Sequence, residues 1–433
     1  MDSIVYLIIS KLNSIFILVQ KVIYLQKCIS IISLNINFSE KSIFLVKEVI
    51  LVSLSFLTEE HILFRKSLRK MLDKEAYPFF NQWEANRDIP KDVWLKMGEN
   101  GFLCPWVDEE YGGLGLDFSY SMILIEELER VGQGLAGGMC LHSEIVSPYI
   151  SEYGTEEQKQ RWLPGCVRGE LISAIGMTEP GAGSDLAGVK TSARREGDYY
   201  ILNGDKTFIT NGLTADIAVV VCKTDPKAQP AHKGISLLVV EKGMIGFKRG
   251  KKLDKIGIHS GDTGELIFED VKVPVANLLG EEGKGFYYLM QNLQQERLVV
   301  AIQCQIEAEE MLRITIDYVK NRKAFGQTIS KFQNTQFKIA EMATEIDIGR
   351  TYVNQLTVRH LEGADIVKEV SMAKWWISEM AKRVAAECLQ LHGGYGYMEE
   401  YEIARRYRDI PVASIYAGST EIMKTIIAKK LDL

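Results

Sequence analysis

Two short stretches of this chain carry residue types that suit cofactor chemistry. Residues 178–185 read TEPGAGSD, and residues 208–212 read FITNG. In the first stretch, two glycines beside a proline let backbone N–H groups turn toward an anion, and Ser184 adds a hydroxyl donor. Taken alone, this stretch fits an ordinary Gly/Pro turn equally well. Its residue types indicate an anion-binding loop without excluding a simple turn.

The second stretch places an aromatic ring next to a hydroxyl group. Because side chains alternate along a strand, Phe208 and Thr210 are expected on one face. Such a pair could cover a flavin ring and hydrogen-bond its N5 atom. A cross-strand packing pair is the common alternative.

A candidate base, Glu296, lies in the sequence QQERL at residues 294–298. A carboxylate near the start of a helix is ordinarily solvated and favours the positive end of the helix dipole. Considered by itself, Glu296 has that ordinary interpretation. His392, in QLHGG at residues 390–394, is likewise expected to be structural, and we assign it no role.

Hydrophobic spacing predicts the elements that position these residues. Apolar side chains recur at helical intervals after Thr58, which can cap the first helix, and again over 93–99, 120–131 and 156–163. Glycine-rich breaks separate these patterns. They predict an N-terminal helical domain over residues 57–170.

A β-rich segment follows. Asn203-Gly204 lies between apolar stretches at 199–202 and 206–210, and it predicts a hairpin turn because this step readily adopts positive φ. The segment predicts a compact, mostly antiparallel central β domain over 171–284. Further strands are expected at 217–222, 235–240 and 266–273.

Three long amphipathic segments, almost free of proline, predict a C-terminal helical bundle over residues 285–433. The order of helices, sheet and helices indicates a multidomain fold of the α+β class. Arg322 and Phe325, in RKAFG, end the first of these helices, where they could form a simple cap with solvated charges. The three helical segments span 287–322, 333–362 and 366–393.

Composition and spacing exclude several classes of function. The chain is 46% hydrophobic and 25% charged, with a net charge of -6 and no long basic run, which argues against a nucleic-acid surface. Seven scattered cysteines and six histidines show no metal-ligand spacing, which predicts a reducing compartment and no metal. Residues 132–137 match G-x-G-x-x-G, but a helix precedes them, so we interpret them as a loop and not as a dinucleotide site.

Residues 1–56 differ from the rest of the chain. They are rich in Ile, Leu, Ser and Asn, and the first arginine is Arg65. Lysines interrupt the apolar runs before they reach the roughly 18–20 residues that span a bilayer. The segment lacks both a signal-peptide cleavage pattern and the arginines of a transit peptide. We expect an atypical extension without stable membrane insertion, and a membrane-associating segment is the alternative.

Together with IYAGSTE at residues 415–421, these motifs resemble the acyl-CoA dehydrogenase family over about residues 57–433. The resemblance implies the same three-part fold and an FAD cofactor. In the family, the threonine matching Thr178 binds the flavin ring, the serine matching Ser184 binds the pyrophosphate, and Phe208 is usually a tryptophan. The residues that the resemblance assigns to FAD are Thr178, Ser184, Phe208, Thr210, Arg322, Phe325, Gln333, Gln390, Gly394 and Ser419.

The family's usual catalytic glutamate is missing, because Ala417 stands at its position and alanine cannot take a proton. Long-chain and isovaleryl-type members instead carry the base at the position matching Glu296, so the resemblance implies that Glu296 is the base. It also assigns the substrate to Arg297, Tyr416, Ala417 and Gly418. The backbone N–H at Ala417 survives the exchange, and we expect it to hydrogen-bond the thioester oxygen together with a flavin ribityl hydroxyl.

The implied reaction is the FAD-dependent α,β-dehydrogenation of an acyl-CoA thioester to a trans-2-enoyl-CoA, a step of fatty acid β-oxidation in lipid metabolism. Electrons would pass to an electron-transfer flavoprotein. Alanine at position 417 leaves room beside the acyl chain, which predicts long or branched substrates. Two alternatives stay open: a flavin monooxygenase or oxidase of the same fold, and a non-catalytic acyl-CoA-binding homologue.

The resemblance also bears on assembly and location. The segment QLHGG reaches the cofactor of a neighbouring subunit in the family, which implies at least a dimer here. The family is commonly a homotetramer, built as a dimer of dimers. We expect the cytoplasm if the protein is bacterial and the mitochondrial matrix if it is eukaryotic, with the cytoplasm preferred.

Overall fold

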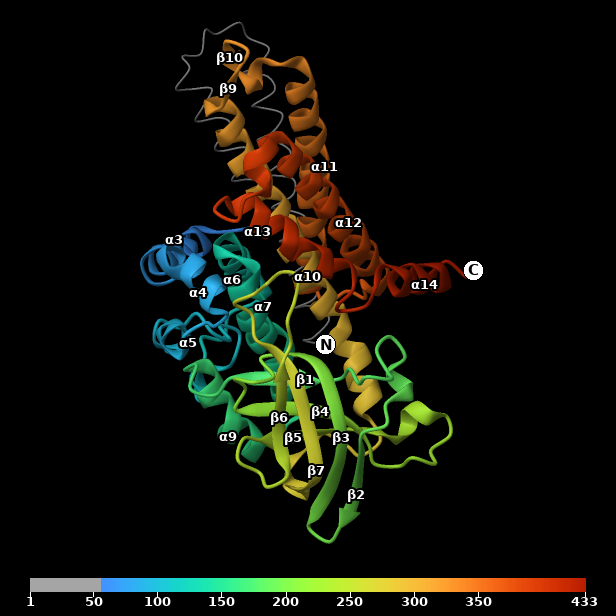
Figure 1. Cartoon of the computed structure of the whole chain (residues 1–433). Coiled ribbons are helices and arrows are strands. Elements are labelled where there is room, and N and C mark those ends of the chain that lie inside the picture. The colour runs from blue at the N-terminus through green and yellow to red at the C-terminus, as the bar shows by residue number, and fades with distance from the viewer. Residues whose placement is uncertain (1–55) are drawn as a thin grey trace, which may run out of the picture. The chain divides into compact units, whose positions relative to one another are not determined.

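The computed structural model of this chain describes residues 56–433 (Figure 1). The predicted extension, residues 1–56, lies outside the described residues except for Phe56. Among the described helices, none is both long and apolar enough to span a membrane.

Short helices open the described part of the chain, and local capping explains two of their starts. Asp117 precedes α6 (Phe118–Val131) and accepts a hydrogen bond from the Ser119 N–H, while Thr155 and Gln158 form a capping box at the start of α9 (Glu156–Val167). The other N-terminal helices are α3 (Glu59–Glu75), α4 (Phe80–Asn86), α5 (Lys91–Glu99), α7 (Gln133–Cys140) and α8 (Ser147–Tyr153), with a π-helical turn at Leu141–Val146.

The prediction of a loop at residues 132–137 is wrong. Gly132 ends α6, and the residues after it form the first turns of α7. Gly132 adopts a φ of 155°, and a Cβ there would lie 2.3 Å from the Phe80 ring, so glycine lets the chain between α6 and α7 pass close to Phe80 of α4. A helix does precede the motif, which removes the structural context that a dinucleotide fingerprint requires.

The central part is one eight-stranded sheet. Its strand order is β6-β7-β3-β2-β4-β5-β8, and β1 pairs with β4. All pairs are antiparallel except β1–β4 and β2–β4. The strands are β1 (Ser173–Gly176), β2 (Ser192–Glu196), β3 (Tyr199–Thr210), β4 (Ile217–Lys223), β5 (Ile235–Glu241), β6 (Phe247–Lys252), β7 (Thr263–Pro274) and β8 (Leu278–Leu279).

The uninterrupted apolar runs in β4 and β5 reflect burial on both faces. Alternate residues join two separate cores: Val219 and Leu237 pack with Trp162 from α9, whereas Val220 and Leu238 pack with other strands of the sheet. A strand buried on both sides needs apolar side chains at every position.

The hairpin predicted at Asn203-Gly204 is also wrong. β3 runs through this step, and the register against β7 shifts there, which makes it a β-bulge. The Asn203 side chain exchanges hydrogen bonds of 2.9 Å with Asp270 on β7, and a Cβ on Gly204 would lie 2.5 Å from the Thr191 Oγ1 atom. Pairing on both sides therefore outweighs the local turn preference.

The C-terminal part is a bundle built on α10 (Gly285–Asn321), which packs against α11 (Gln333–Leu361), α12 (Val367–His392) and α6. α10 begins against β5, where Gly285 lies close to the Ser236 backbone. Its far end carries the short hairpin of β9 (Lys323–Ala324) and β10 (Gln327–Thr328), away from the sheet (Figure 1). The bundle continues with α13 (Glu402–Asp409) and α14 (Thr420–Lys430).

A buried ion pair supports the loop at residues 178–185. The Lys206 Nζ atom donates to the Glu179 Oε1 atom at 2.8 Å, and both side chains are almost inaccessible. Glu179 also accepts hydrogen bonds from the N–H groups of Lys190 and Thr191, at 2.6 and 2.9 Å. The Glu179 carboxylate thus connects the loop to Lys206 on β3 and to the backbone of residues 190–191, which follow the loop.

Replacing Lys206 with methionine is expected to destabilise the protein by about 3–5 kcal/mol, because Glu179 is left as a buried, uncompensated charge. Thermal melting should show a midpoint several degrees lower. The matched control is Lys190→Met, an exposed lysine in the same region. Adding Glu179→Gln to Lys206→Met should recover part of the loss, and an unchanged midpoint in the single variant would contradict this account.

Candidate active site

Glu296 does not occupy the solvated helix start that its sequence position allows. It lies in the fourth turn of α10, with 5% of its surface exposed. Burial raises the pKa of its carboxyl to about 7, although a hydrogen bond from Tyr149 and the charge of Arg297 oppose that rise. A carboxyl group that titrates near neutral pH is suited to accept a proton.

Tyr149 holds the carboxyl group in place. This side chain on α8 is fully buried, and its hydroxyl donates to the Glu296 Oε1 atom at 2.8 Å. The sequence analysis missed Tyr149, because its partner lies 147 positions away in another part of the fold.

A cavity of about 90 Å³ lies beside Glu296, between α8, α10 and α11. Glu144 is buried at its wall, and burial raises the pKa of that carboxyl to about 7 as well. Gln295 connects two sides of the cavity, because it donates to the Glu144 carbonyl and contacts His360 on α11. The remaining lining residues are Ile145, Pro148, Glu152, Gln291, Asn292 and Gln294.

The segment around Ala417 has an unusual backbone. Ala417 has a φ of 51° and Gly418 a φ of 93°, so two successive residues are left-handed. This conformation is costly for alanine. Before the turn, the Tyr416 hydroxyl accepts a hydrogen bond from Gln133 at 3.0 Å; after it, Ser419 caps α14. Among the described residues, no hydrogen-bond acceptor is found for the Ala417 N–H, so this group can bind a ligand.

Arg297 exposes 6% of its surface, and its Nε atom has no hydrogen-bond partner in residues 56–433. A buried donor without a partner is unfavourable unless a ligand satisfies it. The Arg297 Nε atom is therefore available to a ligand.

The sheet carries the first group of candidate cofactor residues. Thr178 and Ser184 lie on the loop after β1, and Phe208 and Thr210 lie at the C-terminal end of β3. Phe208 has a φ of 59° at a second register shift and exposes 69% of its surface, while Ile209 beside it is buried. Within the described part of the chain, the hydroxyl groups of Thr178, Ser184 and Thr210 make no hydrogen bond to protein, so these groups can bind a ligand.

The turn of the β9–β10 hairpin carries part of a second group of candidate cofactor residues. Phe325 and Gly326 connect β9 to β10 with φ values of 52° and 80°, a turn that normally selects Asn or Gly. Phe325 exposes 95% of its surface. A strained, exposed aromatic residue is a candidate for contact with a ligand or a partner.

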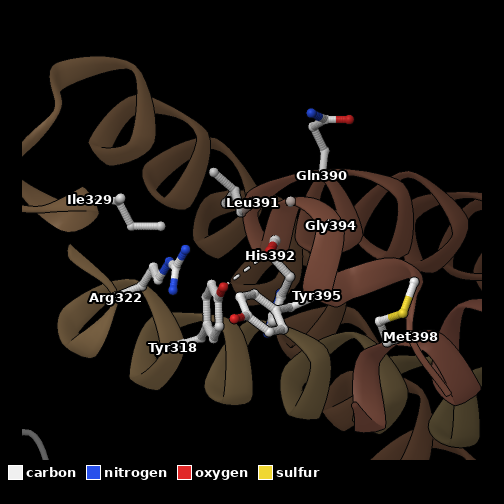
Figure 2. A pocket seen from close by; sticks show the side chains of 10 residues that line it. Tyr318, Arg322, Ile329, Gln390, Leu391, His392, Gly394, Tyr395 and Met398 are labelled. Atoms are coloured by element: carbon white, nitrogen blue, oxygen red, sulfur yellow. Dashed lines mark hydrogen bonds between the residues drawn. The ribbon is translucent and has the colours of Figure 1, made fainter. Parts of the chain in front are cut away.

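A groove of about 510 Å³ lies next to this hairpin (Figure 2). Arg322, Gln390 and Gly394 line it, and the Arg322 guanidinium sits 5.0 Å from the centre of the Tyr395 ring. Figure 2 shows the Gln390 amide turned away from Arg322. His392 has the structural role expected of it, because it stacks on Tyr318 with ring centres 4.2 Å apart.

The candidate cofactor residues therefore form two separate groups. One lies on the sheet, where α10 begins, and the other lies beyond the end of α10. At 1.5 Å per residue, the 37 residues of α10 span roughly 55 Å. The structure brings Arg322, Gln390 and Gly394 together, but it does not bring them to Thr178 and Ser184.

The exposed groups fit a flavin nucleotide. Gly181 and Gly183 border open space in the loop, where backbone N–H groups could contact a pyrophosphate. Phe208 offers an exposed aromatic face for a planar ring, and Arg322 offers a guanidinium for a phosphate. These residues suit the group that the sequence implies.

Models of three parts of one family match this chain. They are the acyl-CoA dehydrogenase N-terminal domain at residues 58–170, the middle domain at 174–271 and the C-terminal domain at 283–431. The long-chain specific acyl-CoA dehydrogenase, mitochondrial, of Sus scrofa is 48% identical over 379 residues, covering 86% of this chain and 87% of that protein.

Solved structures give the same result. An acyl-CoA dehydrogenase from Geobacillus kaustophilus has a TM-score of 0.86 and 67% identity, covering 87% of this chain and 99% of that one. A chain from a structure described as the electron transferring flavoprotein of Acidaminococcus fermentans has a TM-score of 0.83 and 39% identity, covering 87% and 98%.

The three domain models and the relatives named acyl-CoA dehydrogenases place this chain among the flavoprotein oxidoreductases that act on CH–CH groups. The chain belongs to the acyl-CoA dehydrogenase family. The family assignment and the α+β fold of three parts predicted from the sequence are thereby confirmed.

Replacing Tyr149 with phenylalanine should raise the pKa of Glu296 above its value of about 7, because the hydrogen bond that favours the ionised carboxylate is lost. A hydrogen bond to a charged group contributes about 1.5–3 kcal/mol, so we expect a rise of roughly one to two pH units. A base acts only when deprotonated. The rising limb of kcat against pH should therefore move to higher pH.

Tyr153→Phe is the matched control, because the Tyr153 hydroxyl contacts Gln291 and Asn292 instead of Glu296. The rising limb of kcat against pH in Tyr153→Phe should stay at the wild-type position. If the limb of Tyr149→Phe also stays there, Glu296 is not the group that the profile reports.

Proposed function

We propose that this enzyme catalyses the FAD-dependent α,β-dehydrogenation of acyl-CoA thioesters with Glu296 as the base. The observation that carries the proposal is the burial of this carboxyl on α10, hydrogen-bonded by Tyr149 and beside a cavity. A buried carboxyl with a pKa near neutrality, held by a hydrogen bond beside a cavity, is suited to act as a base. The burial of the Glu296 carboxyl also argues against a non-catalytic homologue.

In the proposed reaction, the Glu296 carboxylate removes the α-proton of the thioester, and a double bond forms between the α- and β-carbons. Bound FAD supplies the acceptor for the hydride that leaves the β-carbon, so the product is a trans-2-enoyl-CoA. Desolvation by an apolar acyl chain would make the carboxylate a stronger base than it is in water. The catalytic power that the protein adds is then the placement of this carboxylate and of the donors for the thioester oxygen.

The thioester oxygen gains negative charge as the α-proton leaves. The Ala417 N–H is a suitable donor for it, because it has no partner among the described residues and its backbone is fixed in a left-handed turn. A backbone donor does not depend on the side chain at position 417. Arg297 is the proposed second contact on the substrate side, and Tyr416 and Gly418 hold the turn.

We propose long or branched acyl groups as substrates. The support is the small side chain at position 417 and the resemblance to a long-chain specific relative. A carboxylate at Glu296 leaves the space beside Ala417 to the acyl chain. Dicarboxylic substrates should be poor, because Glu144 and Glu152 line the cavity beside the base.

We propose that FAD binds between two copies of the chain. Thr178, Ser184, Phe208 and Thr210 would come from one copy, and Gln390 with Gly394 from its neighbour. The proposal rests on the length of α10, which separates these groups in one chain. Arg322, Phe325 and Gln333 lie at the same end as Gln390, and Ser419 lies at the start of α14, on the substrate side.

The proposed electron acceptor is an electron-transfer flavoprotein, supported by the similarity to a chain from such a system. The relative from Sus scrofa is named as mitochondrial. We propose the mitochondrial matrix if this chain is eukaryotic and the cytoplasm if it is bacterial.

Anaerobic titration with butyryl-, isovaleryl-, octanoyl- and palmitoyl-CoA tests the reaction. We expect a long or branched thioester to bleach the flavin band, and Glu296→Gln to abolish the bleaching. The glutamine variant should fold, because the raised pKa of Glu296 means that ionisation weakens the folded state as pH rises through about 7, and glutamine removes that cost. Bleaching only by butyryl-CoA would contradict the chain-length proposal, and an active Glu296→Gln would contradict the base.

Mixed oligomers test the shared cofactor site. Ser184→Asp should repel the pyrophosphate at the sheet, and Gln390→Ala with Arg322→Ala should weaken the other end, so each variant alone should bind little FAD. Co-expressed with different affinity tags, the two chains should form one intact and one doubly defective site. Purified hetero-oligomers should then regain about half of the wild-type FAD content. If they regain none, both halves belong to the same chain.

A further inference from the structure

Lys374 is a buried cation whose surroundings do not explain it structurally. It lies on α12 with no measurable exposure, and it takes part in no ion pair among the described residues. Its Nζ atom donates to one acceptor, the Gly418 carbonyl, at 2.6 Å. Burying an ammonium without an ion-pair partner is expensive, so its retention calls for a function of the charge.

The charged and titratable groups around Lys374 come from three helices. Arg297 and Cys304 face it from α10, Glu379 from its own helix, and Glu421 from α14. Arg297 repels the ammonium, and the Cys304 thiol is neutral at physiological pH because burial raises its pKa to about 12. Glu379 is already engaged by Lys382 and by the Thr420 hydroxyl. Glu421 is exposed to solvent, which screens its charge, so the positive charge of Lys374 is only partly balanced.

The contact with Gly418 fixes a strained turn. Gln133 holds Tyr416 before the left-handed pair, and Lys374 holds Gly418 within it. Glycine suits this position, because its φ is 93° and a Cβ here would lie 2.5 Å from the Met423 Cε atom. Strained backbone persists when contacts on both sides determine it.

We propose that Lys374 is a positioning residue of the dehydrogenation reaction: by holding the Gly418 carbonyl, it fixes the turn that presents the Ala417 N–H to the thioester oxygen, and its charge stabilises the enolate that forms there. This inference rests on the proposed function. Charge in a water-excluded site acts strongly on a developing anion. Lys374 itself need not touch the substrate, since it acts through the backbone of the turn.

The test compares Lys374→Met with Lys374→Arg, which keeps the positive charge and the donor. Lys368→Met makes the same chemical change on the same helix, at a half-buried position, and serves as the matched control. With the best substrate of the acyl-CoA panel, Lys374→Met should lower kcat on the order of 10- to 100-fold with little change in KM. Lys374→Arg should restore a substantial part of kcat, and the control should resemble the wild type.

A spectroscopic readout separates positioning from a general structural role. A bound 3-oxoacyl-CoA loses its α-proton to give an enolate that absorbs in the ultraviolet and visible range. Titration against pH should show that the acidity of this bound proton falls at least about tenfold in Lys374→Met, or one pH unit, and recovers in Lys374→Arg. Hydrogen exchange of a peptide covering residues 415–419, measured without substrate, should be faster in Lys374→Met only.

The outcomes are distinguishable. A wild-type enzyme that no thioester reduces overturns the proposed function. A reducible wild type with unchanged kcat and unchanged enolate acidity in Lys374→Met overturns the role of Lys374 alone. Equal losses in Lys374→Met and Lys374→Arg also overturn it, because a role of the charge requires rescue. If Lys374→Met does not fold, Lys374→Gln takes its place, since it keeps a donor and lacks the charge.

Discussion

One helix sets the geometry on which the candidate site depends. α10 begins against β5, carries Glu296 and Arg297 in its buried first half, and ends immediately before Arg322. Because a helix has a fixed rise per residue, the distance between its two ends does not vary with local packing. Glu296 is thereby held at the junction of the N-terminal helices, the sheet and the bundle, while the groove at the far end is held away from it.

The buried charges near this junction share one energetic property. Glu296, Arg297 and Lys374 are removed from water, and none of them has an ion-pair partner within residues 56–433 like the one that Lys206 has in Glu179. Folding alone would favour apolar residues at such positions. The energetic cost of burying these charges is explained if the groups act on charge that appears only when a substrate reacts. A preorganised, water-excluded environment stabilises such charge without further rearrangement. The left-handed alanine at position 417 adds backbone strain at the same place.

The separation of the two groups of candidate cofactor residues bears on how the protein assembles. A strained, exposed Phe325 and a groove lined by Arg322 and Gln390 lie at the far end of α10 from Thr178 and Ser184. If the cofactor site needs two copies, binding of FAD and association of subunits stabilise each other. Oligomerisation would then be part of the active site and not only a route to stability.

The sequence by itself determined the order of elements, the long helices and the residue types of the site, since helical periodicity and short motifs such as TEPGAGSD are local properties of the chain. The resemblance to the acyl-CoA dehydrogenase family implied Glu296 as the base, since Ala417 stands at the family's usual position. The tertiary structure decided what local pattern cannot. Asn203-Gly204 became a bulge because β7 and Thr191 pack against it, and residues 133–137 form the first turns of α7, directly after Gly132, which lies against Phe80 of α4. Tyr149 and Lys374 gained their roles only through contacts with residues far away in the sequence, because burial, and with it the pKa of Glu296, is a property of the packed molecule.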